Sequence, residues 1–526
     1  MTVKVRPKLL FCLLIGVLGA AFGITSTIQQ IDVVASDVGS DKGHQSDAEE
    51  RDVSILEPKS ELAVDQTMSN DHVFSGVVET SPSDVKAFSN SLNRGTTTKA
   101  TNSTDTLVSV NTQFSDQNEP TVSIEPRSGH NRGSERLVAG ANDYRSGDAQ
   151  CGIYTSRNGG KTWHNGGVLP GPFTSADGTL LPVQGDPVVR HSRNGDVFYS
   201  CLAFSRSEGS GSVFISRSTN HGSTWSLPIP VRQGSTREFN DKPWLAVDQS
   251  ARSPFKDNVY LCWTQFVSSD GTINFAKSMN LKYKFSSQII LSTSKSNQGC
   301  TIDVALNGTI FVAWIDLASS QLMVVKSTDG GETFSCPVMV NNVFRIPSPL
   351  PNNNFRVFPL PSMAIAKSGN VYIVWPDDRF RASGFGSDIL MATSTDGGNS
   401  WTTKLVNTGD RTNTDQFFPT IDISYNQKKV KNIGVGTIVV FYYDKRYGLP
   451  FNTMVDVTEA YSTESADTFS LHRITYVSSD LNSCSFSHFV GDYIDVRANR
   501  ATHGVWTDCR DTTQINQEIF TDKVTH

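Results

Sequence analysis

The sequence lacks the surplus of basic residues that marks nucleic-acid-binding proteins. It holds 46 Lys and Arg against 52 Asp and Glu, a net charge of −6, and so shows no basic footprint for phosphate. Its eight cysteines show no Cys-x-x-Cys or Cys/His ligand spacing, and no His-Glu-x-x-His motif or Ser/His/Asp elbow occurs. We therefore predict no nucleic-acid partner, no metal site and no cofactor.

An apolar run long enough to cross a membrane is also missing. The apolar segment Leu9–Ile24 has 16 residues, fewer than the roughly 20 that a spanning helix needs. Lys4, Arg6 and Lys8 precede it, and small residues close it, which is the order of a secretory signal. We predict a signal peptide at residues 1–24, with an uncleaved membrane anchor as the alternative. The protein is then secreted or held at the cell surface.

Residues 25–105 contain little that could form a core. They are rich in Ser, Thr, Asp and Asn without regularly spaced apolar positions, which is typical of segments that cannot bury enough surface to fold. We predict a disordered spacer at 25–105 and one folded domain at 106–526. Seven cysteines lie in that domain and can form disulfides after export, but their spacing leaves the pairing open.

The folded domain is repetitive. Six eight-residue segments follow the pattern Ser-x-Asp-x-Gly-x-Thr-Trp at intervals of about 60 residues, which indicates a repeat architecture. These box segments begin at Ser156, Ser218, Ser278, Ser327, Ser394 and Ser462. Asp or Asn and Gly suit a tight turn, and the closing aromatic residue can anchor a hairpin by burial. We therefore interpret the boxes as scaffold and their aspartates as non-catalytic.

Two strand-like runs precede each box. A seventh pair of runs, GDYIDVRANRATHGVWTDCR, follows the last box, and a lone strand at Thr106–Asn111 opens the domain. Val-rich and aromatic runs broken by Gly/Asn turns indicate antiparallel strands. If the lone strand completes the last unit, the ring closes and no sheet edge is left exposed. We predict an all-β propeller of seven four-stranded blades, with six blades as the alternative.

The box segments resemble those of the sialidase (neuraminidase) superfamily over roughly 105–526. The resemblance implies three arginines that grip a sialic acid carboxylate, a Tyr nucleophile activated by Glu, and an Asp acid/base; a Tyr nucleophile is the sialidase variant of glycoside hydrolysis. The family's Phe-Arg-Ile-Pro motif is similar to Phe344–Pro347, which contains Arg345. Sialidases carry this motif before the first box, whereas here it lies between the boxes at Ser327 and Ser394.

A second pattern lies at the ends of four second strands. An aspartate is followed two residues later by an arginine, and an aromatic residue stands two positions earlier in the last three cases. The pairs are Asp143/Arg145, Asp377/Arg379, Asp444/Arg446 and Asp508/Arg510. In one interpretation each Asp pairs with an Arg to lock blades together. In the other, the guanidinium forks hold an anionic group of the ligand.

Residues at the starts of the first strands share that face of the propeller. They include Asp186, Glu238, Asp241, Arg356, Asp492 and Tyr493. We predict Tyr493 as a nucleophile and Glu238 or Asp241 as an acid/base, with Arg356 and Arg345 joining the four arginines in substrate binding. Three functions stay open: an extracellular propeller that recognises glycans or glycoconjugates, with an acidic one favoured by the arginines; an active exo-sialidase-type hydrolase; and a protein-binding scaffold.

Overall fold

The computed structural model describes residues 105–109, 115–126, 134–207, 209–235, 237–279, 284–380, 386–408, 413–425, 436–448, 452–463, 465–484, 488–510 and 516–525. The predicted signal peptide, and the predicted spacer except Asp105, lie outside these residues. Within them the chain forms seven four-stranded antiparallel sheets and contains no α-helix. None of the described segments is a helix with the length and apolar character needed to cross a membrane.

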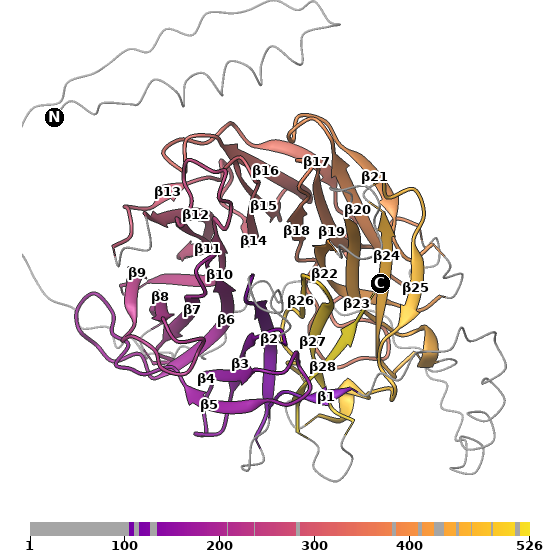
Figure 1. Cartoon of the computed structure of the whole chain (residues 1–526), viewed down its shortest axis with the longest axis horizontal. Helices are drawn as coiled ribbons and strands as arrows, with labels where there is room; N and C mark the ends of the chain where they lie inside the picture. The colour runs from indigo at the N-terminus through magenta and orange to yellow at the C-terminus, as the bar shows by residue number, and fades with distance from the viewer. Residues whose placement is uncertain are drawn as a thin grey trace, which may run out of the picture. The chain divides into compact units, whose positions relative to one another are not determined.

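Each sheet is one blade of a ring (Figure 1). The first four blades contain β2 (Gln117–Ile124), β3 (Leu137–Asp143), β4 (Gln150–Ser156) and β5 (His164–Val168); β6 (Val183–His191), β7 (Val197–Phe204), β8 (Gly211–Ser218) and β9 (Ile229–Arg232); β10 (Glu238–Val247), β11 (Val259–Val267), β12 (Asp270–Ser278) and β13 (Ile289–Ile290); and β14 (Asn297–Val304), β15 (Ile310–Asp316), β16 (Gln321–Ser327) and β17 (Val338–Asn342). The last three contain β18 (Ser362–Ile365), β19 (Val371–Asp377), β20 (Asp388–Ser394) and β21 (Thr402–Leu405); β22 (Gln416–Ser424), β23 (Thr437–Asp444), β24 (Asp456–Thr463) and β25 (Ser470–Arg473); and β26 (Asp495–Ala498), β27 (Thr502–Asp508), β28 (Glu518–Val524) and β1 (Thr106–Leu107).

The two ends of the folded domain meet in the seventh blade. Strand β1 pairs antiparallel with β28, so that Thr106 faces Thr521 and Leu107 faces Phe520, and indigo lies beside yellow in Figure 1. The backbone N–H of Val108 adds a 2.8 Å hydrogen bond to the Ile519 carbonyl. The predicted seven blades and their closure by an N-terminal strand are confirmed, and the six-bladed alternative is wrong.

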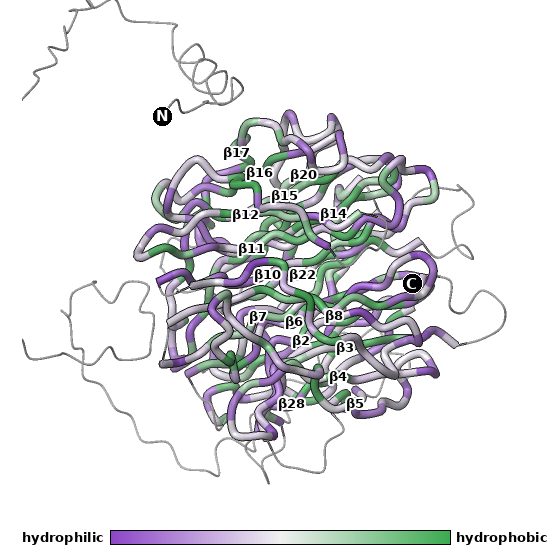
Figure 2. Tube along the Cα trace, turned by 90° about the vertical axis from the view of Figure 1, so that its left-hand side faces the viewer, coloured by the Kyte–Doolittle hydropathy of each residue, from purple (hydrophilic) through white to green (hydrophobic). Residues whose placement is uncertain are grey.

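Burial on both faces explains the composition of the inner strands. Blades pack face to face, so strands such as β3 and β19 are buried along their whole length, whereas the outer strand β5 is half-buried or exposed. Strands buried on both sides favour continuous apolar runs over strict alternation. Figure 2 shows these hydrophobic stretches (green) running through the stacked strands, with hydrophilic residues (purple) gathered in the connecting turns.

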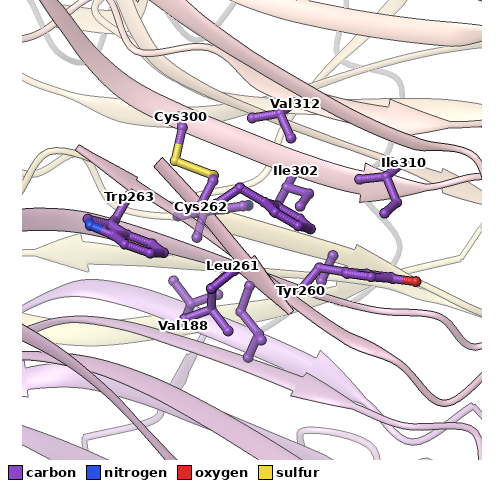
Figure 3. Close-up of a cluster of buried hydrophobic side chains, with 14 of the residues drawn as sticks. Val188, Tyr260, Leu261, Cys262, Trp263, Cys300, Ile302, Ile310 and Val312 are labelled. Atoms are coloured by element: carbon purple, nitrogen blue, oxygen red, sulfur yellow. A yellow bond between two sulfur atoms is a disulfide. The ribbon is translucent and has the colours of Figure 1, made fainter. Parts of the chain in front are cut away.

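Disulfides fasten the packed blades. Cys262 on β11 bonds to Cys300 on β14 and joins the third and fourth blades within a buried apolar cluster (Figure 3). Two more disulfides link Cys151 to Cys201 and Cys484 to Cys509. Their sequence separations of 50, 38 and 25 residues correspond to about 3 to 4 kcal/mol each in the loop-closure model.

The six box segments join the third and fourth strands of blades one to six. In the segment at Ser327, the Asp329 carboxylate accepts hydrogen bonds from the backbone N–H groups of Glu332 (3.1 Å) and Thr333 (2.9 Å), and the Ser327 hydroxyl accepts from Gly331 (2.9 Å). Asn158 takes the aspartate's place in the first box and accepts from Thr162 at 2.9 Å. Because antiparallel strands alternate in direction, these turns lie at the opposite end of each blade from the start of its first strand.

The box aromatic residues differ in burial, and this difference predicts unequal costs of removal. Trp163 is 8% exposed and donates its indole N–H to the Gly160 carbonyl at 3.2 Å, whereas Trp401 is only half-buried. We expect Trp163→Ala to lower the free energy of unfolding by about 3 to 5 kcal/mol, and Trp401→Ala to lower it by less. Urea denaturation measures both; equal losses would contradict the burial argument.

Candidate functional site

Five of the seven first strands carry a bulge at the same position near their start. The shift in pairing falls between Asn118 and Thr121, Gly185 and Val188, Asp241 and Trp244, Gln298 and Thr301, and Phe417 and Thr420. The bulged residues have left-handed backbone, with φ of 53° at Glu119, 51° at Asp186, 50° at Lys242, 70° at Gly299 and 47° at Phe418. For a residue other than glycine this costs about 1 to 3 kcal/mol and clusters at functional sites.

The bulges bring ionisable side chains of different blades together. Bulges re-aim side chains relative to the regular pleat, and three of these five carry Glu119, Asp186 and Lys242. With their neighbours they form what we name the central cluster: Glu119, Asp186, Asp241, Lys242, Arg356, Asp492 and Tyr493. Its members come from the first strands of blades one, two and three, from the segment just before the first strand of blade seven, and from the connection between blades four and five.

Glu119 and Asp186 share one hydrogen bond inside the cluster. Burial and the neighbouring Glu119 charge raise the pKa of Asp186 well above its ordinary value, so Asp186 holds the proton and donates it to Glu119. Burial and Asp492 also raise the pKa of Glu119. Glu119 in turn accepts from the Asp492 backbone N–H at 3.0 Å and from Asn142 at 2.9 Å. The first, second and seventh blades are thereby joined through carboxyl groups.

Asp241 is the cluster carboxyl that titrates near neutrality. Burial first, and then the neighbouring Asp186 carboxyl, raise the pKa of Asp241 to about 7. The Gln298 side chain donates to its Oδ2 at 2.9 Å and opposes this shift. Its side chain is only partly buried. Asp241 can therefore hold or release a proton close to neutral pH at an accessible position.

Arg356 reaches the cluster from a strap, residues 343–361, that connects blades four and five. Its guanidinium binds both carboxylate oxygens of Asp492, at 3.1 and 2.6 Å, and its side chain is 50% exposed. The strap is anchored elsewhere by Lys445, which donates to Asn353, and by the Asn354 N–H, which donates to Asn482 at 3.0 Å. Arg356 is thus held in place by contacts to the sixth and seventh blades.

Lys242 and Tyr493 form the floor of the cluster. The Lys242 ammonium lies 3.5 Å from the centre of the Tyr493 ring and 4.8 Å from that of Trp244. The Tyr493 hydroxyl donates to the Pro187 carbonyl at 3.1 Å, and burial together with nearby carboxylates raises its pKa well above 10. These contacts oppose the phenolate that the predicted nucleophile requires. A cavity of about 20 Å³ beside these residues has room for about one water molecule.

The predicted site residues separate into two groups. Asp186, Asp241, Arg356, Asp492 and Tyr493 come together in the central cluster. Glu238 instead forms a two-pronged ion pair with Arg232, at 2.6 and 2.8 Å, and Arg345 is exposed and donates to the Leu317 carbonyl.

Each of the four Asp-x-Arg arginines is held by the aspartate two residues before it. The contacts within these pairs join Arg145 to Asp143, Arg379 to Asp377, Arg446 to Asp444 and Arg510 to Asp508. The preceding aromatic residue uses the same carboxylate: Trp375 donates to Asp377 at 2.9 Å and Trp506 to Asp508 at 3.1 Å. The pairing of each Asp with an Arg is thus observed, and both partners belong to one strand end. Arg379 also reaches the neighbouring blade four, where it donates to the Asn341 side chain at 3.1 Å and to the Asn342 carbonyl.

Removal of one such aspartate is expected to destabilise the domain. Asp377 is 1% exposed and accepts from both Trp375 and Arg379. Asp377→Ala leaves a guanidinium and an indole N–H without their acceptor, and we expect it to lower the free energy of unfolding by about 3 to 5 kcal/mol. Arg379→Lys, which keeps the charge, should cost less. A loss below 1 kcal/mol for Asp377→Ala in chemical denaturation would contradict this account.

Glu119 and Lys242 are cluster residues that the sequence analysis missed. Both stand immediately before a proline at the start of a first strand, as do Asp186 and Phe418. A residue before proline is restricted in conformation, and proline within a strand marks a bulge or an edge. This repeated pair, a residue followed by proline at the start of a first strand, is the sequence pattern that could have indicated the bulges. In the part of the chain that the structure describes, no group of three or more His, Cys, Asp or Glu is arranged to hold a metal ion.

Comparison with known proteins finds likeness in structure only. No protein-family model and no curated protein matches the chain. Similar solved structures include an alpha-L-arabinanase of Penicillium chrysogenum (12% identity, 81% of this chain and 99% of that chain, TM-score 0.43), a leech intramolecular trans-sialidase (9%, 80% and 93%, 0.43) and the NanB sialidase of Streptococcus pneumoniae (10%, 74% and 84%, 0.42). The chemistry of this chain therefore has to be argued from the site itself.

Proposed function

We propose that the protein is an exported propeller that binds a glycan at the central cluster. The observation that carries this proposal is the convergence of seven polar side chains from four blades and the strap, held by bulges whose left-handed residues cost stability. A concave site with a few convergent polar groups is the default location of a ligand. Sugar hydroxyls both donate and accept hydrogen bonds, and the cluster offers carboxyl groups, an arginine and nearby amides to meet them.

Hydrolysis of the bound glycan is a second candidate function. Asp241, with its pKa raised to about 7, resembles the general acid that a glycosidase uses to protonate the leaving oxygen. Other carboxylates of the cluster supply the second acidic group that the reaction requires. The exo-sialidase mechanism through Tyr493 is less well supported, since the surroundings of its hydroxyl oppose ionisation. A protein-binding scaffold is the function that remains if no sugar binds.

Binding and turnover can be tested with one matched pair of variants. Purified protein is titrated by calorimetry with neutral and sialylated oligosaccharides and assayed with fluorogenic glycosides. Arg356→Gln removes the fork that holds Asp492, and we expect it to weaken binding at least 10-fold. Arg345→Gln changes an exposed arginine of the same strap outside the cluster and should leave affinity within about 2-fold.

Two results would overturn this proposal. One is equal affinity in wild type and Arg356→Gln when both proteins melt at the same temperature. The other is the absence of binding to every sugar of the panel. Turnover that is lost in Asp241→Asn, with binding retained, would add hydrolysis to the function; no turnover in the wild type would leave a binding protein.

A further inference from the structure

We propose that the central cluster takes an uncharged sugar and rejects one that carries a carboxylate. This inference rests on the proposed function and names the class of its ligand. It departs from the acidic glycan that the arginine pattern favoured in the sequence. The reason lies in the charges that the cluster holds and in how its two cations are used.

The cluster contains four carboxyl groups and two cations. Glu119, Asp186, Asp241 and Asp492 face Lys242 and Arg356. Carboxyl groups thus outnumber cations two to one, and burial lowers the pKa of Lys242. Asp241 adds a negative charge when it ionises, so the surroundings of a ligand carboxylate are predominantly acidic. A ligand carboxylate would meet like charge at close range, which opposes binding.

Both cations already have partners in the cluster. Arg356 directs Nε and Nη2 at the two carboxylate oxygens of Asp492, so its charge is balanced and a ligand could use only the remaining N–H groups of the fork. Lys242 is 6% exposed and packs against the rings of Tyr493 and Trp244. The cavity of about 20 Å³ that it lines holds about one water molecule and is too small for a sugar acid.

The remaining candidate arginines are bound to aspartates of their own. Arg145, Arg379, Arg446 and Arg510 each contact the carboxylate two residues earlier, and those four aspartates are at most 1% exposed. Pulling a guanidinium away would leave a buried carboxylate without its partner, which is strongly unfavourable. Three arginines that converge on one carboxylate, as sialic acid recognition requires, are not found among the described residues of the cluster.

The same groups suit a hydroxyl-rich ligand. A protonated Asp241 can donate and accept, Gln298 carries both functions beside it at 2.9 Å, and ionised carboxylates accept from hydroxyls. The half-buried rings of Phe358 and Phe489 flank Arg356 at 5.4 and 4.6 Å and offer apolar surface for the C–H face of a sugar ring. An uncharged sugar can make these contacts without needing an unpaired cation in the site.

The test compares three forms of the same disaccharide. Calorimetry at pH 8 measures neutral pentose- and hexose-based disaccharides, the uronic acid form of each, and the methyl ester of that acid; lactose, 3′-sialyllactose and its methyl ester form a further set. The ester keeps the size of the acid and removes its charge. We expect the neutral sugar and the ester of at least one set to bind at least 10-fold more tightly than the acid.

Two variants test whether the ratio of the affinity for the ester to the affinity for the acid depends on the central cluster. Asp241→Asn removes the charge that Asp241 gains as it ionises, and it should reduce the ester-to-acid ratio at pH 8 by at least 3-fold. Asp467→Asn makes the same change at a 76%-exposed side chain in a box turn at the other end of the blades and should leave the ratio unchanged. An acid that binds as tightly as its ester, or more tightly, overturns this inference while glycan binding stands. If no form of any sugar binds, the proposed function itself fails.

Discussion

Removal of residues 1–109 is expected to abolish cooperative folding of the propeller or to lower its melting temperature by at least about 10 °C. Removal of residues 1–104 is expected to leave it unchanged. The two truncations differ only in the five residues 105–109, which the structure places at the seam of the ring. The effect is large because β1, which lies within these residues, is the strand that pairs with β28 and completes the seventh blade.

The contacts at the seam explain this expectation. Val108 is fully buried and Ser109 is 1% exposed, and the Ser109 hydroxyl accepts from the Ile519 N–H at 2.9 Å. Asp105 accepts from Arg510 at 2.5 Å and from the Tyr476 backbone N–H at 3.1 Å. Loss of these residues exposes a strand edge and leaves the Arg510 guanidinium with one acidic partner fewer. Calorimetry measures the melting temperatures of both truncated proteins. Equal melting temperatures would contradict the idea that closure of the ring stabilises the domain.

The stability that carboxyls inside the ring contribute is expected to fall as the pH rises from 5 to 8. Asp303, Asp422 and Asp495 stand on the innermost strands, and each accepts a backbone N–H of the next blade: from Ile365 (2.9 Å), Ala498 (2.8 Å) and Val122 (3.1 Å) respectively. Burial raises the pKa of Asp303 to about 6 and that of Asp422 to about 7. Arg190 lies near Asp303 and Asp495, and Arg497 lies near Asp422 and Asp495.

The sign follows from the direction of these shifts. A folded-state pKa above the unfolded value means that the folded protein binds more protons, so the stabilisation is complete below the unfolded pKa of about 3.9 and is lost as pH rises through 6 to 7. Each group contributes at most about 3 to 4 kcal/mol. Two groups act oppositely: Glu135, whose pKa is lowered to about 2, does so below about pH 4, and His191, whose pKa burial lowers to about 3, does so up to about pH 6.5.

Variants of one of these carboxyls isolate the effect. The free energy of unfolding is measured by urea at pH 5, 6, 7 and 8 for the wild type, Asp422→Asn and the surface control Asp467→Asn. Asp422→Asn should lose roughly 2 kcal/mol or more of the difference between pH 5 and pH 8, while the control keeps it. An identical pH dependence in all three proteins would show that Asp422 titrates normally.

The architecture was predictable because it depends on local patterns. Strand pairs and turn residues recur within each repeat, and the lone strand at Thr106 resolved the mismatch between seven strand pairs and six boxes. The aromatic-x-Asp-x-Arg pattern was also visible, but its function was not. A guanidinium can reach several places from one strand end, and only the folded structure shows that Arg379 turns back on Asp377.

The centre of the site was harder to predict for a geometric reason. Side chains of a regular strand alternate between its two faces, and a bulge breaks that alternation at the very positions that carry Glu119 and Lys242. Arg356 comes from a strap of 19 residues whose path over the sixth and seventh blades depends on contacts such as that between Asn354 and Asn482. Local sequence preferences therefore identified some members of the cluster without indicating their partners.

The most direct test of the central claim is the crystal structure of the protein with the neutral disaccharide that binds most tightly in calorimetry. We expect the sugar to lie at the central cluster, with hydroxyls within hydrogen-bond distance of Asp241 and Arg356 and with Lys242 still beneath it. A sugar bound at the Asp-x-Arg pairs or in the box turns, with the cluster empty, would contradict the account.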